Sequence, residues 1–388
     1  MRHVLVLLAI LCTAALARAE APFRALWVTR WDYRAPADVT RIMSEAASLG
    51  VTDVLWQVRG QADAFYKSAL EPWGRELFRD LPPNAKDPGY DPLALAVTEA
   101  HARGLKIHAW INVMPMWKGK DPPADQSHLF HTHPVWRLYD AKGAPQALND
   151  HYIIVNPIYP EVQDHIVAVG ADIMRRYPLD GLHLDYVRFV SDTMKDAAAY
   201  PGDERSLALF KQATGRHAVS TKDDQAAYRV FIRQRITDLV RRLKKEAVGL
   251  RPGAVLTAAV WRRPELATDT QLQDAPLWLK EGTIDRAMPM IYQKDDAKYE
   301  SDLSAWVDAV GAKNLPRLSP GIANYMHSPD QTSVQIRIGA RLGLTTYGVF
   351  AYSSLFESVD PNQDKSPSEI KLRADRRKAL KAFLKANQ

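Results

Sequence analysis

The stretch DGLHLDYVRF, residues 180–189, alternates like a buried strand but carries charged side chains where the strand should end. Successive side chains of a strand point to opposite faces, so Leu182 and Leu184 would share one face and His183 and Asp185 the other. Burying an unpaired polar group costs roughly a few kcal/mol, so such a residue needs a reason. The stretch predicts a strand that ends at the floor of a cleft. The alternative is a structural ion pair between Asp185 and Arg59 or Arg188.

Strand and helix patterns alternate along the rest of the chain, which is typical of a single (β/α)8 TIM barrel. No Pro/Gly/Ser-rich linker divides the sequence, and the turn after the first strand, DYRAPAD, lacks the glycines that a doubly wound dinucleotide-binding sheet would need. Helical patterns occupy 36–50, 91–104, 159–177 and 228–250. The predicted strands are residues 24–31, 52–59, 105–112, 180–187, 254–261, 284–292, 317–324 and 345–352.

Two long segments follow the third and fourth predicted strands. Residues 113–158 and 188–224 carry little periodic pattern and are expected to be mostly loop. In a barrel of this kind the loops after strands lie at the carboxyl face, where active sites are found. Loops of such length are usually functional or disordered.

The N-terminus has the pattern of a secretory signal peptide, residues 1–19. Basic residues precede an apolar run of about 13 residues, too short to span a bilayer comfortably, and Ala17-Arg18-Ala19 forms a cleavage pattern. Cleavage there would remove the only cysteine, Cys12, and leave residues 20–388 as an exported catalytic domain without a transmembrane segment, in a periplasm or at a cell surface. An uncleaved anchor and a lipoprotein signal are the alternatives.

Two further strands aim polar groups to the same side as Asp185. Gln57 and Arg59 lie near the end of 52–59, and Asn112 ends 105–112. The mid-strand residues His108 and His183 are expected to be hydrogen-bonded core histidines. Asp53 and Asp180, which begin their strands, are expected to be structural.

These residue types suit the hydrolysis of a glycosidic bond, which needs two carboxyl groups, surfaces for sugar rings and neutral donors for hydroxyls. The sequence lacks a G-x-S-x-G elbow, a P-loop and a basic stripe for nucleic acid, and the mature chain would lack a thiol. His128, His131 and His133 resemble a metal cluster without matching carboxylates, so no metal or other cofactor is expected. The candidate sugar-binding residues are Gln57, Trp73, Trp110, Asn112, Trp117, Asn156, Tyr186, Trp261, Tyr292, Gln293 and Tyr325.

Several long stretches together resemble the glycosyl-hydrolase-like family ten of bacterial envelope proteins. They are RALWVTRW (24–31), VLWQVRGQADAFYKSALEPW (54–73), PGYDPLALAVTEAHARGLKIHAWIN (88–112), VNPIYPEVQDHI (155–166), YPLDGLHLDYVRF (177–189) and MPMIYQ (288–293). The resemblance implies a barrel that acts on peptidoglycan glycan strands stripped of their peptides, with cell-division proteins as partners by analogy.

The resemblance also implies catalytic roles. Asp185 is similar to the strand-four aspartate that acts as nucleophile in α-amylase-like barrels, whose acid follows strand five. Here strand five ends AAVWRRPE, with Glu265 four residues past Trp261, which is not a clean match. Glu357 and Asp295 are the other candidates for the second carboxyl group.

The sequence therefore predicts an exported glycoside hydrolase of envelope glycan, with Asp185 as nucleophile or base and Glu357 or Glu265 as proton donor. Arg59 and Arg188 are expected to hold Asp185 ionised, since a nearby cation lowers a carboxyl pKa, or to bind the lactyl carboxylate of muramic acid. A glycan-binding barrel without catalysis and a hydrolase of a secreted exopolysaccharide are the alternative functions.

Overall fold

The structure, a computed structural model, describes residues 22–82, 84–189, 194, 196–216 and 219–387. The predicted signal peptide, residues 1–19, lies outside this range. No helix within it is long and apolar enough to cross a membrane.

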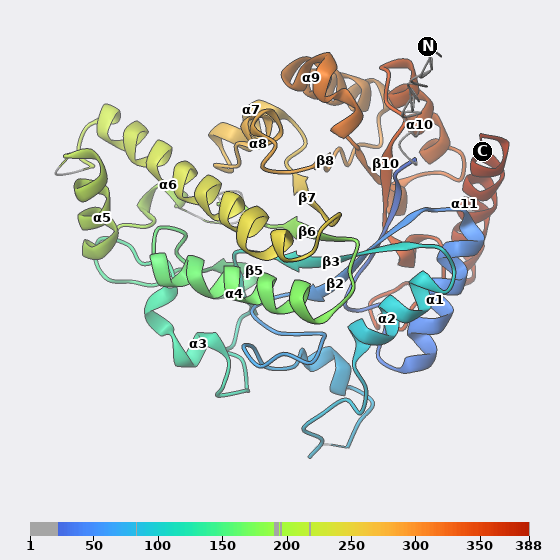
Figure 1. Cartoon of the computed structure of the whole chain (residues 1–388), viewed down its shortest axis with the longest axis horizontal. Coiled ribbons are helices and arrows are strands. Elements are labelled where there is room, and N and C mark those ends of the chain that lie inside the picture. The colour runs from blue at the N-terminus through green and yellow to red at the C-terminus, as the bar shows by residue number, and fades with distance from the viewer. Residues whose placement is uncertain (1–21, 83, 190–193, 195, 217–218, 388) are drawn as a thin grey trace, which may run out of the picture.

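Eight parallel strands form a nearly closed barrel at the centre of the molecule, as the strand pattern predicts (Figure 1). Their order is β8-β7-β6-β3-β2-β1-β10-β9, and the two edge strands meet through single parallel bridges at Ala287–Leu318 and Met290–Gly321. The strands are β1 (Arg24–Val28), β2 (Asp53–Arg59), β3 (Lys106–Asn112), β6 (Gly181–Asp185), β7 (Val255–Val260), β8 (Arg286–Pro289), β9 (Gly321–Ala323) and β10 (Tyr347–Phe350).

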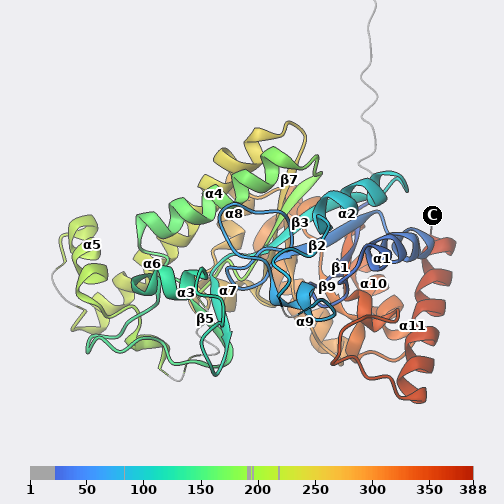
Figure 2. The ribbon, with the colours of Figure 1, turned by 90° about the horizontal axis from the view of Figure 1, so that it is seen from below.

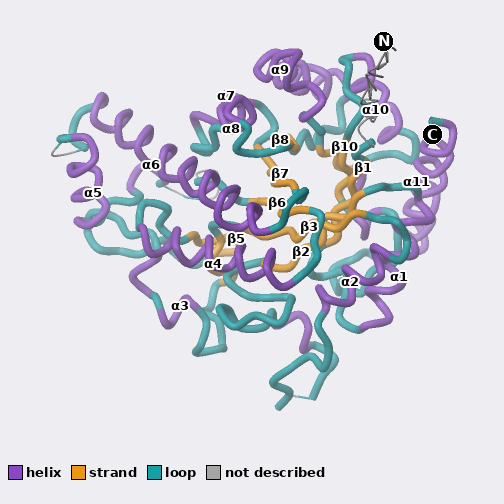
Figure 3. The backbone as a smooth tube through the Cα atoms, in the orientation of Figure 1, coloured by secondary structure: helices purple, strands orange, loops and turns teal. Residues whose placement is uncertain are grey.

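Helices cover the outside of the barrel, and at least one lies between each pair of successive barrel strands (Figure 3). Proline at the first helical position starts several of them, because its missing N–H needs no partner there. Figure 2 shows α5 and α6 at one end of the molecule and α11 at the other. The helices are α1 (Pro36–Leu49), α2 (Pro92–His101), α3 (Leu129–Thr132), α4 (Pro160–Arg176), α5 (Glu204–Thr214), α6 (Lys222–Arg242), α7 (Pro264–Asp269), α8 (Ala275–Glu281), α9 (Asp296–Asn314), α10 (Gln331–Arg341) and α11 (Pro367–Ala386).

The two faces of the strands separate as the alternation predicts. Leu182 and Leu184 belong to the large apolar layer between strands and helices. The barrel interior instead holds hydrogen-bonded histidines. His108 Nε2 lies 2.8 Å from Asp53 Oδ1, and His183 bonds both the Trp27 indole, at 3.1 Å, and the Thr257 hydroxyl, at 2.8 Å. Pairing of this kind removes most of the cost of burying polar groups.

The segment after β3 is more ordered than the sequence predicts. Residues 113–158 contain an antiparallel pair, β4 (Pro115–Gly119) and β5 (Asn149–Ile154), rather than mostly loop. Strand β4 is held further by a hydrogen bond from the Lys118 amide to the Gln61 side chain. Pairing between segments so distant in sequence depends on the tertiary fold, so local pattern missed it. The segment after β6 likewise contains α5.

The close approach of β6 to β3 and β7 requires glycine at position 181. A Cβ on Gly181 would overlap His108 Nδ1 and lie 2.7 Å from the Val255 carbonyl oxygen.

We therefore expect Gly181→Ala to lower the free energy of unfolding by about 1–3 kcal/mol, the usual cost of overpacking. Urea denaturation of the purified protein measures this change. The control is Gly339→Ala in α10, where no atom would lie nearer than 3.9 Å and the substitution should be neutral or stabilising. Equal stability of the Gly181→Ala variant and the wild type would contradict this packing.

Candidate active site

A cleft of about 510 Å³ opens at the carboxyl ends of the barrel strands. Ligand sites of barrel enzymes lie at this face. The antiparallel pair β4–β5 also contributes residues to the lining of the cleft, among them Lys118 and Tyr152. The predicted site residues that line it are Gln57, Trp110, Asn112, Asp185, Tyr186, Arg188, Trp261 and Tyr292.

Asp185 ends β6 and is 7% exposed. Its Oδ1 accepts a hydrogen bond of 2.6 Å from the backbone N–H of Tyr186, a residue held in the left-handed region at φ 48°. Burial raises the Asp185 pKa to about 6, although the Tyr186 N–H, the Arg188 charge and the Trp110 indole each lower it. A carboxyl group that titrates near neutrality in a cleft is typical of a functional site.

Aromatic rings surround this carboxylate. The Arg188 guanidinium lies over the Tyr186 ring, at 4.8 Å from its centroid, and over the Trp261 ring, at 4.5 Å. Tyr186 also packs edge-to-face against Tyr152 of β5, with centroids 4.9 Å apart. Such rings offer apolar faces and polar edges, which suits sugar rings.

The cleft carries more positive than negative charge. Asp185 is the only carboxylate among the described residues that line it, whereas Arg30, Lys118, Arg188 and Arg262 are cations of the lining. Two of these cations also have acidic partners outside the lining, since Arg262 lies 2.9 Å from Asp302 and Arg30 lies 3.6 Å from Glu76. Arg30, Lys118 and Arg262 were not predicted from the sequence. Lys118 and Arg262 belong to segments whose conformation the local sequence pattern does not define. Arg30 stands one residue from the end of a predicted strand, where an end-of-strand search could have found it.

Arg30 is the least satisfied of these cations. Arg30 is 1% exposed, and its guanidinium lies 4.0 Å from the Trp31 ring centroid. One terminal nitrogen donates to the Tyr152 hydroxyl at 3.2 Å, and Nε lies 3.6 Å from Glu76. Nη1 has no hydrogen-bond partner among the described residues. Arg30 is therefore buried beside the cleft with part of its hydrogen-bonding capacity unused.

Arg59 does not face Asp185, contrary to the alternation of β2. The register of β2 on β3 shifts between Gln57 and Arg59, which turns Arg59 toward Glu71. The two side chains form hydrogen bonds of 2.7 and 2.8 Å. Burial alone would raise the Glu71 pKa, but Arg59 and His165 lower it to about 2. Arg59 is thus neutralised outside the cleft lining.

Five other predicted sugar-binding residues also lie outside this lining. Asn156 is fully buried and bonds Ser206, and the Gln293 side chain donates to Asp302. Tyr325 is 48% exposed and packs against Tyr292, beside the cleft. Trp73 lines a different cavity, together with Trp117.

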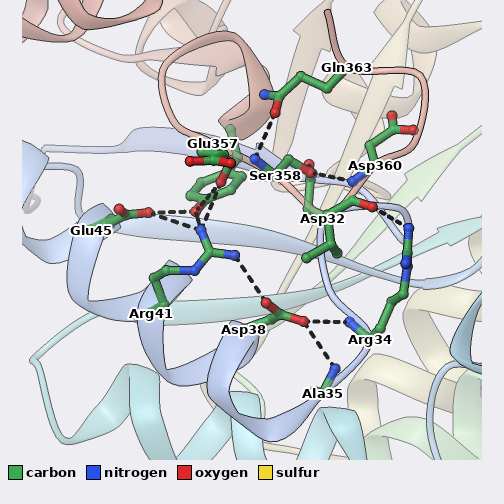
Figure 4. A network of polar contacts seen from close by, with 12 residues as sticks. Asp32, Arg34, Ala35, Asp38, Arg41, Glu45, Glu357, Ser358, Asp360 and Gln363 are labelled. Carbon is green, nitrogen blue, oxygen red and sulfur yellow. Dashed lines mark hydrogen bonds and ion pairs between the residues drawn. The ribbon is translucent and has the colours of Figure 1, made fainter. Parts of the chain in front are cut away.

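The predicted proton donors do not line the cleft. The Glu265 side chain is half exposed and paired with Arg263. The Glu357 side chain is 79% exposed and lies 4.0 Å from Lys365. Figure 4 shows Glu357 beside Arg41 and Glu45 of α1, on the outer layer of the barrel. Asp295 caps α9 through the Lys298 amide. The positions of these three residues do not support the role of proton donor to a sugar bound at Asp185.

The three histidines of the third loop each have a separate contact. His128 bonds the Gln61 carbonyl, His131 bonds the Pro123 carbonyl, and His133 packs on the Trp136 ring. Across the described ranges, no three His, Cys, Asp or Glu side chains gather as metal ligands.

Known proteins share sequence and fold with this chain. Residues 22–331 match the glycosyl hydrolase-like 10 family. The chain belongs to this family. It is 26% identical over 346 residues to the glycosyl hydrolase DigH of Escherichia coli (strain K12), covering 79% of this chain and 74% of the relative. It is 25% identical over 334 residues to the glycosyl hydrolase YngK of Bacillus subtilis (strain 168), covering 77% of this chain and 60% of the relative.

Solved structures share the barrel. The glycoside hydrolase domain of PgaB (BpsB) from Bordetella bronchiseptica superimposes with a TM-score of 0.63 at 14% identity, over 91% of this chain and 98% of that domain. The α-L-fucosidase isoenzyme 2 from Paenibacillus thiaminolyticus also gives 0.63, at 13% identity, over 94% of this chain and 49% of the fucosidase. At these identities the likeness shows the fold alone.

The raised Asp185 pKa predicts a pH-dependent cost in stability. The folded state holds the proton more tightly than the unfolded chain, so stability is complete below pH 4 and falls until pH passes about 6. Asp185→Asn should remove this pH-dependent loss of stability. At pH 7 its free energy of unfolding should exceed that of the wild type by up to about 3 kcal/mol, at about 1.4 kcal/mol per pKa unit. Urea denaturation at pH 4 and pH 7 tests this. An equal difference between the two proteins at both pH values would contradict a titrating Asp185.

Proposed function

We propose that the protein is an exported glycoside hydrolase that cleaves an anionic envelope glycan, most specifically peptidoglycan strands stripped of their peptides. The observation that carries the proposal is a buried carboxylate among sugar-sized aromatic surfaces at the carboxyl end of a barrel. Membership of a glycosyl hydrolase-like family supports the reaction class.

Asp185 is the reacting carboxylate in this proposal, as nucleophile or base. Its hydrogen bond from Tyr186 is donated to the carboxylate, and the Arg188 charge favours the ionised form. Both interactions prepare an anion that can attack, or activate water against, the anomeric carbon. Gln57, Asn112, Trp261 and Tyr292 are proposed to bind the sugar.

The charge of the cleft supports an anionic substrate. Four cations and one carboxylate line the cleft, and Lys118 is half-buried there, whereas Arg30 and Arg262 have acidic partners in Glu76 and Asp302. A peptide-stripped strand carries a lactyl carboxylate on each muramic acid, which a cation such as Lys118 can bind. Export to the periplasm or cell surface follows from the N-terminal pattern, and division proteins are proposed partners by family analogy.

A non-catalytic glycan-binding barrel is the second candidate. The observation in its favour is that Asp185 is the only carboxylate in the described lining of the cleft, whereas hydrolysis commonly uses two. A secreted exopolysaccharide is the alternative substrate, and product analysis on both polymers separates these possibilities.

The decisive experiment is digestion of peptidoglycan, intact and peptide-stripped, with mass spectrometry of the released sugars. Wild type should release sugars from the stripped strands, and Asp185→Asn should lower that rate by about a thousandfold or more, because loss of a catalytic carboxylate removes several kcal/mol of transition-state stabilisation. Release by the variant at the wild-type rate would remove Asp185 from the mechanism, and no release by either protein would favour the binder.

The same assay tests the remaining carboxylates and the role of Asp185. Glu265→Gln and Glu357→Gln should cleave at near the wild-type rate, and loss of cleavage in either would restore it as the proton donor. With Asp185 as nucleophile or base, kcat/KM should fall below about pH 6, where the carboxyl group is protonated. A fall above that pH would instead make Asp185 the proton donor.

The substrate charge can be tested at Lys118, which is half-buried at the cleft wall. Lys118→Met should lower kcat/KM on peptide-stripped strands by about threefold to tenfold, the worth of one partly screened charge contact. Lys106→Met, at the amino end of β3 and exposed, is the matched control and should change nothing. On carboxyl-reduced strands the two variants should behave alike, and a loss that persists there would contradict recognition of the carboxylate.

A further inference from the structure

Three cavities lie side by side in a row that begins at Asp185, and the row is called here the groove. The cleft shares Arg30, Trp31 and Lys118 with a second cavity of about 590 Å³, called here the bridging cavity. The bridging cavity shares Arg75, Phe78 and Gly119 with a third, of about 720 Å³, called the distal cavity. The shared residues place each cavity next to the following one, from the carboxylate to the distal cavity.

Strand β4 is the common wall of this path. Lys118 lines the cleft and the bridging cavity, Gly119 the bridging and distal cavities, and Trp117 the distal cavity. Pairing with β5 fixes the strand, with Lys118 opposite Tyr152. The groove is therefore built on hydrogen-bonded backbone, and its three parts keep a constant spacing.

The distal cavity presents aromatic faces of the kind that bind sugars. Trp73 and Phe78 are half-buried at its wall. Trp117 is buried, its indole N–H donates to the Asp121 carbonyl at 2.7 Å, and the Arg75 guanidinium lies 5.2 Å from its ring centroid. A few polar groups beside apolar rings are typical of a ligand site.

Charge changes along the groove. Four cations line the cleft with Asp185, and two of them, Arg30 and Arg262, have acidic partners outside it. The distal cavity balances its three cations with three acids: Arg75, Lys86 and Lys120 with Asp63, Asp121 and Asp125. An anionic sugar unit fits the cationic part, and a neutral sugar ring fits the aromatic, balanced end. One linear glycan of mixed units would satisfy both ends at once.

We propose that the distal cavity is a remote subsite for the glycan chain whose bond lies at Asp185, so that the protein acts on long chains and poorly on short ones. The proposal rests on the proposed function for the identity of the glycan. Binding energy gained at Trp73 and Phe78 would hold the chain in register with the reacting carbon.

The test uses peptide-stripped peptidoglycan oligosaccharides of increasing length, from disaccharide to octasaccharide. For the wild type, kcat/KM should rise with length until the groove is filled. Trp73→Ala and Phe78→Ala should each lower kcat/KM on the longest chains by about tenfold, and leave the shortest chains unaffected. Equal loss at all lengths, or no dependence of the wild type on length, would overturn the proposal.

The matched control is Phe383→Ala. Phe383 is also a half-buried phenylalanine, but it lies on α11, which Figures 1 and 2 place on the other side of the barrel from β5. This variant should behave like the wild type at every length. Thermal unfolding of all three variants separates loss of binding from loss of fold, and Phe78→Ala carries the test should Trp73→Ala unfold.

Calorimetric binding of the same oligosaccharides to Asp185→Asn separates the two proposals. Affinity that rises with chain length, and that is lost when Phe78→Ala is added, would support the distal subsite. If the wild type cleaved nothing while showing this affinity, the hydrolase would be refuted and the subsite would stand. Cleavage of all lengths at one rate, with affinity independent of length, would refute the subsite and keep the hydrolase.

Discussion

The structure depends on one constraint, the alternation of side chains along eight parallel strands that close on themselves. One face of each strand must be apolar to hold the helices, as Leu182 and Leu184 do, so polar residues are confined to the interior. Inside, His108 and His183 are paired with Asp53 and Thr257. Asp185, at the strand end, pairs with no carboxylate or histidine among the described residues and lines the cleft.

The cleft differs from the interior in charge as well as in access. The antiparallel pair β4–β5 places Lys118 and Tyr152 in the lining of the cleft. The Tyr152 hydroxyl in turn accepts a hydrogen bond from the buried Arg30. Burial raises the Asp185 pKa to about 6, and the Arg188 charge is the cation that opposes this rise. Strand β4 of the same antiparallel pair forms the wall of the groove that leads away from Asp185. The proposed determinants of substrate length and charge therefore lie along one structural element that starts at the reacting group.

The eight strands and the position of Asp185 could be predicted because alternation and helix periodicity are local properties of the sequence. Gln57, Trp110 and Asn112 follow from the same rule and reach the cleft. Arg59 does not, because a register shift in β2 cannot be read from residue order. The antiparallel pair β4–β5 was not predicted for a similar reason, because its two strands lie far apart in sequence. The second carboxylate could not be placed either, since the directions of the Glu265 and Glu357 side chains depend on loop conformation, and both pair with neighbouring cations outside the cleft lining.

A crystal structure would show whether a glycan chain passes Asp185 along the groove. Asp185→Asn would be crystallised with a peptide-stripped oligosaccharide long enough to fill the three cavities. We expect a glycosidic bond within contact of the side chain at position 185 and a sugar ring against Trp73 or Phe78. A chain bound on another face, or one that enters the cleft without a glycosidic bond near position 185, would contradict it.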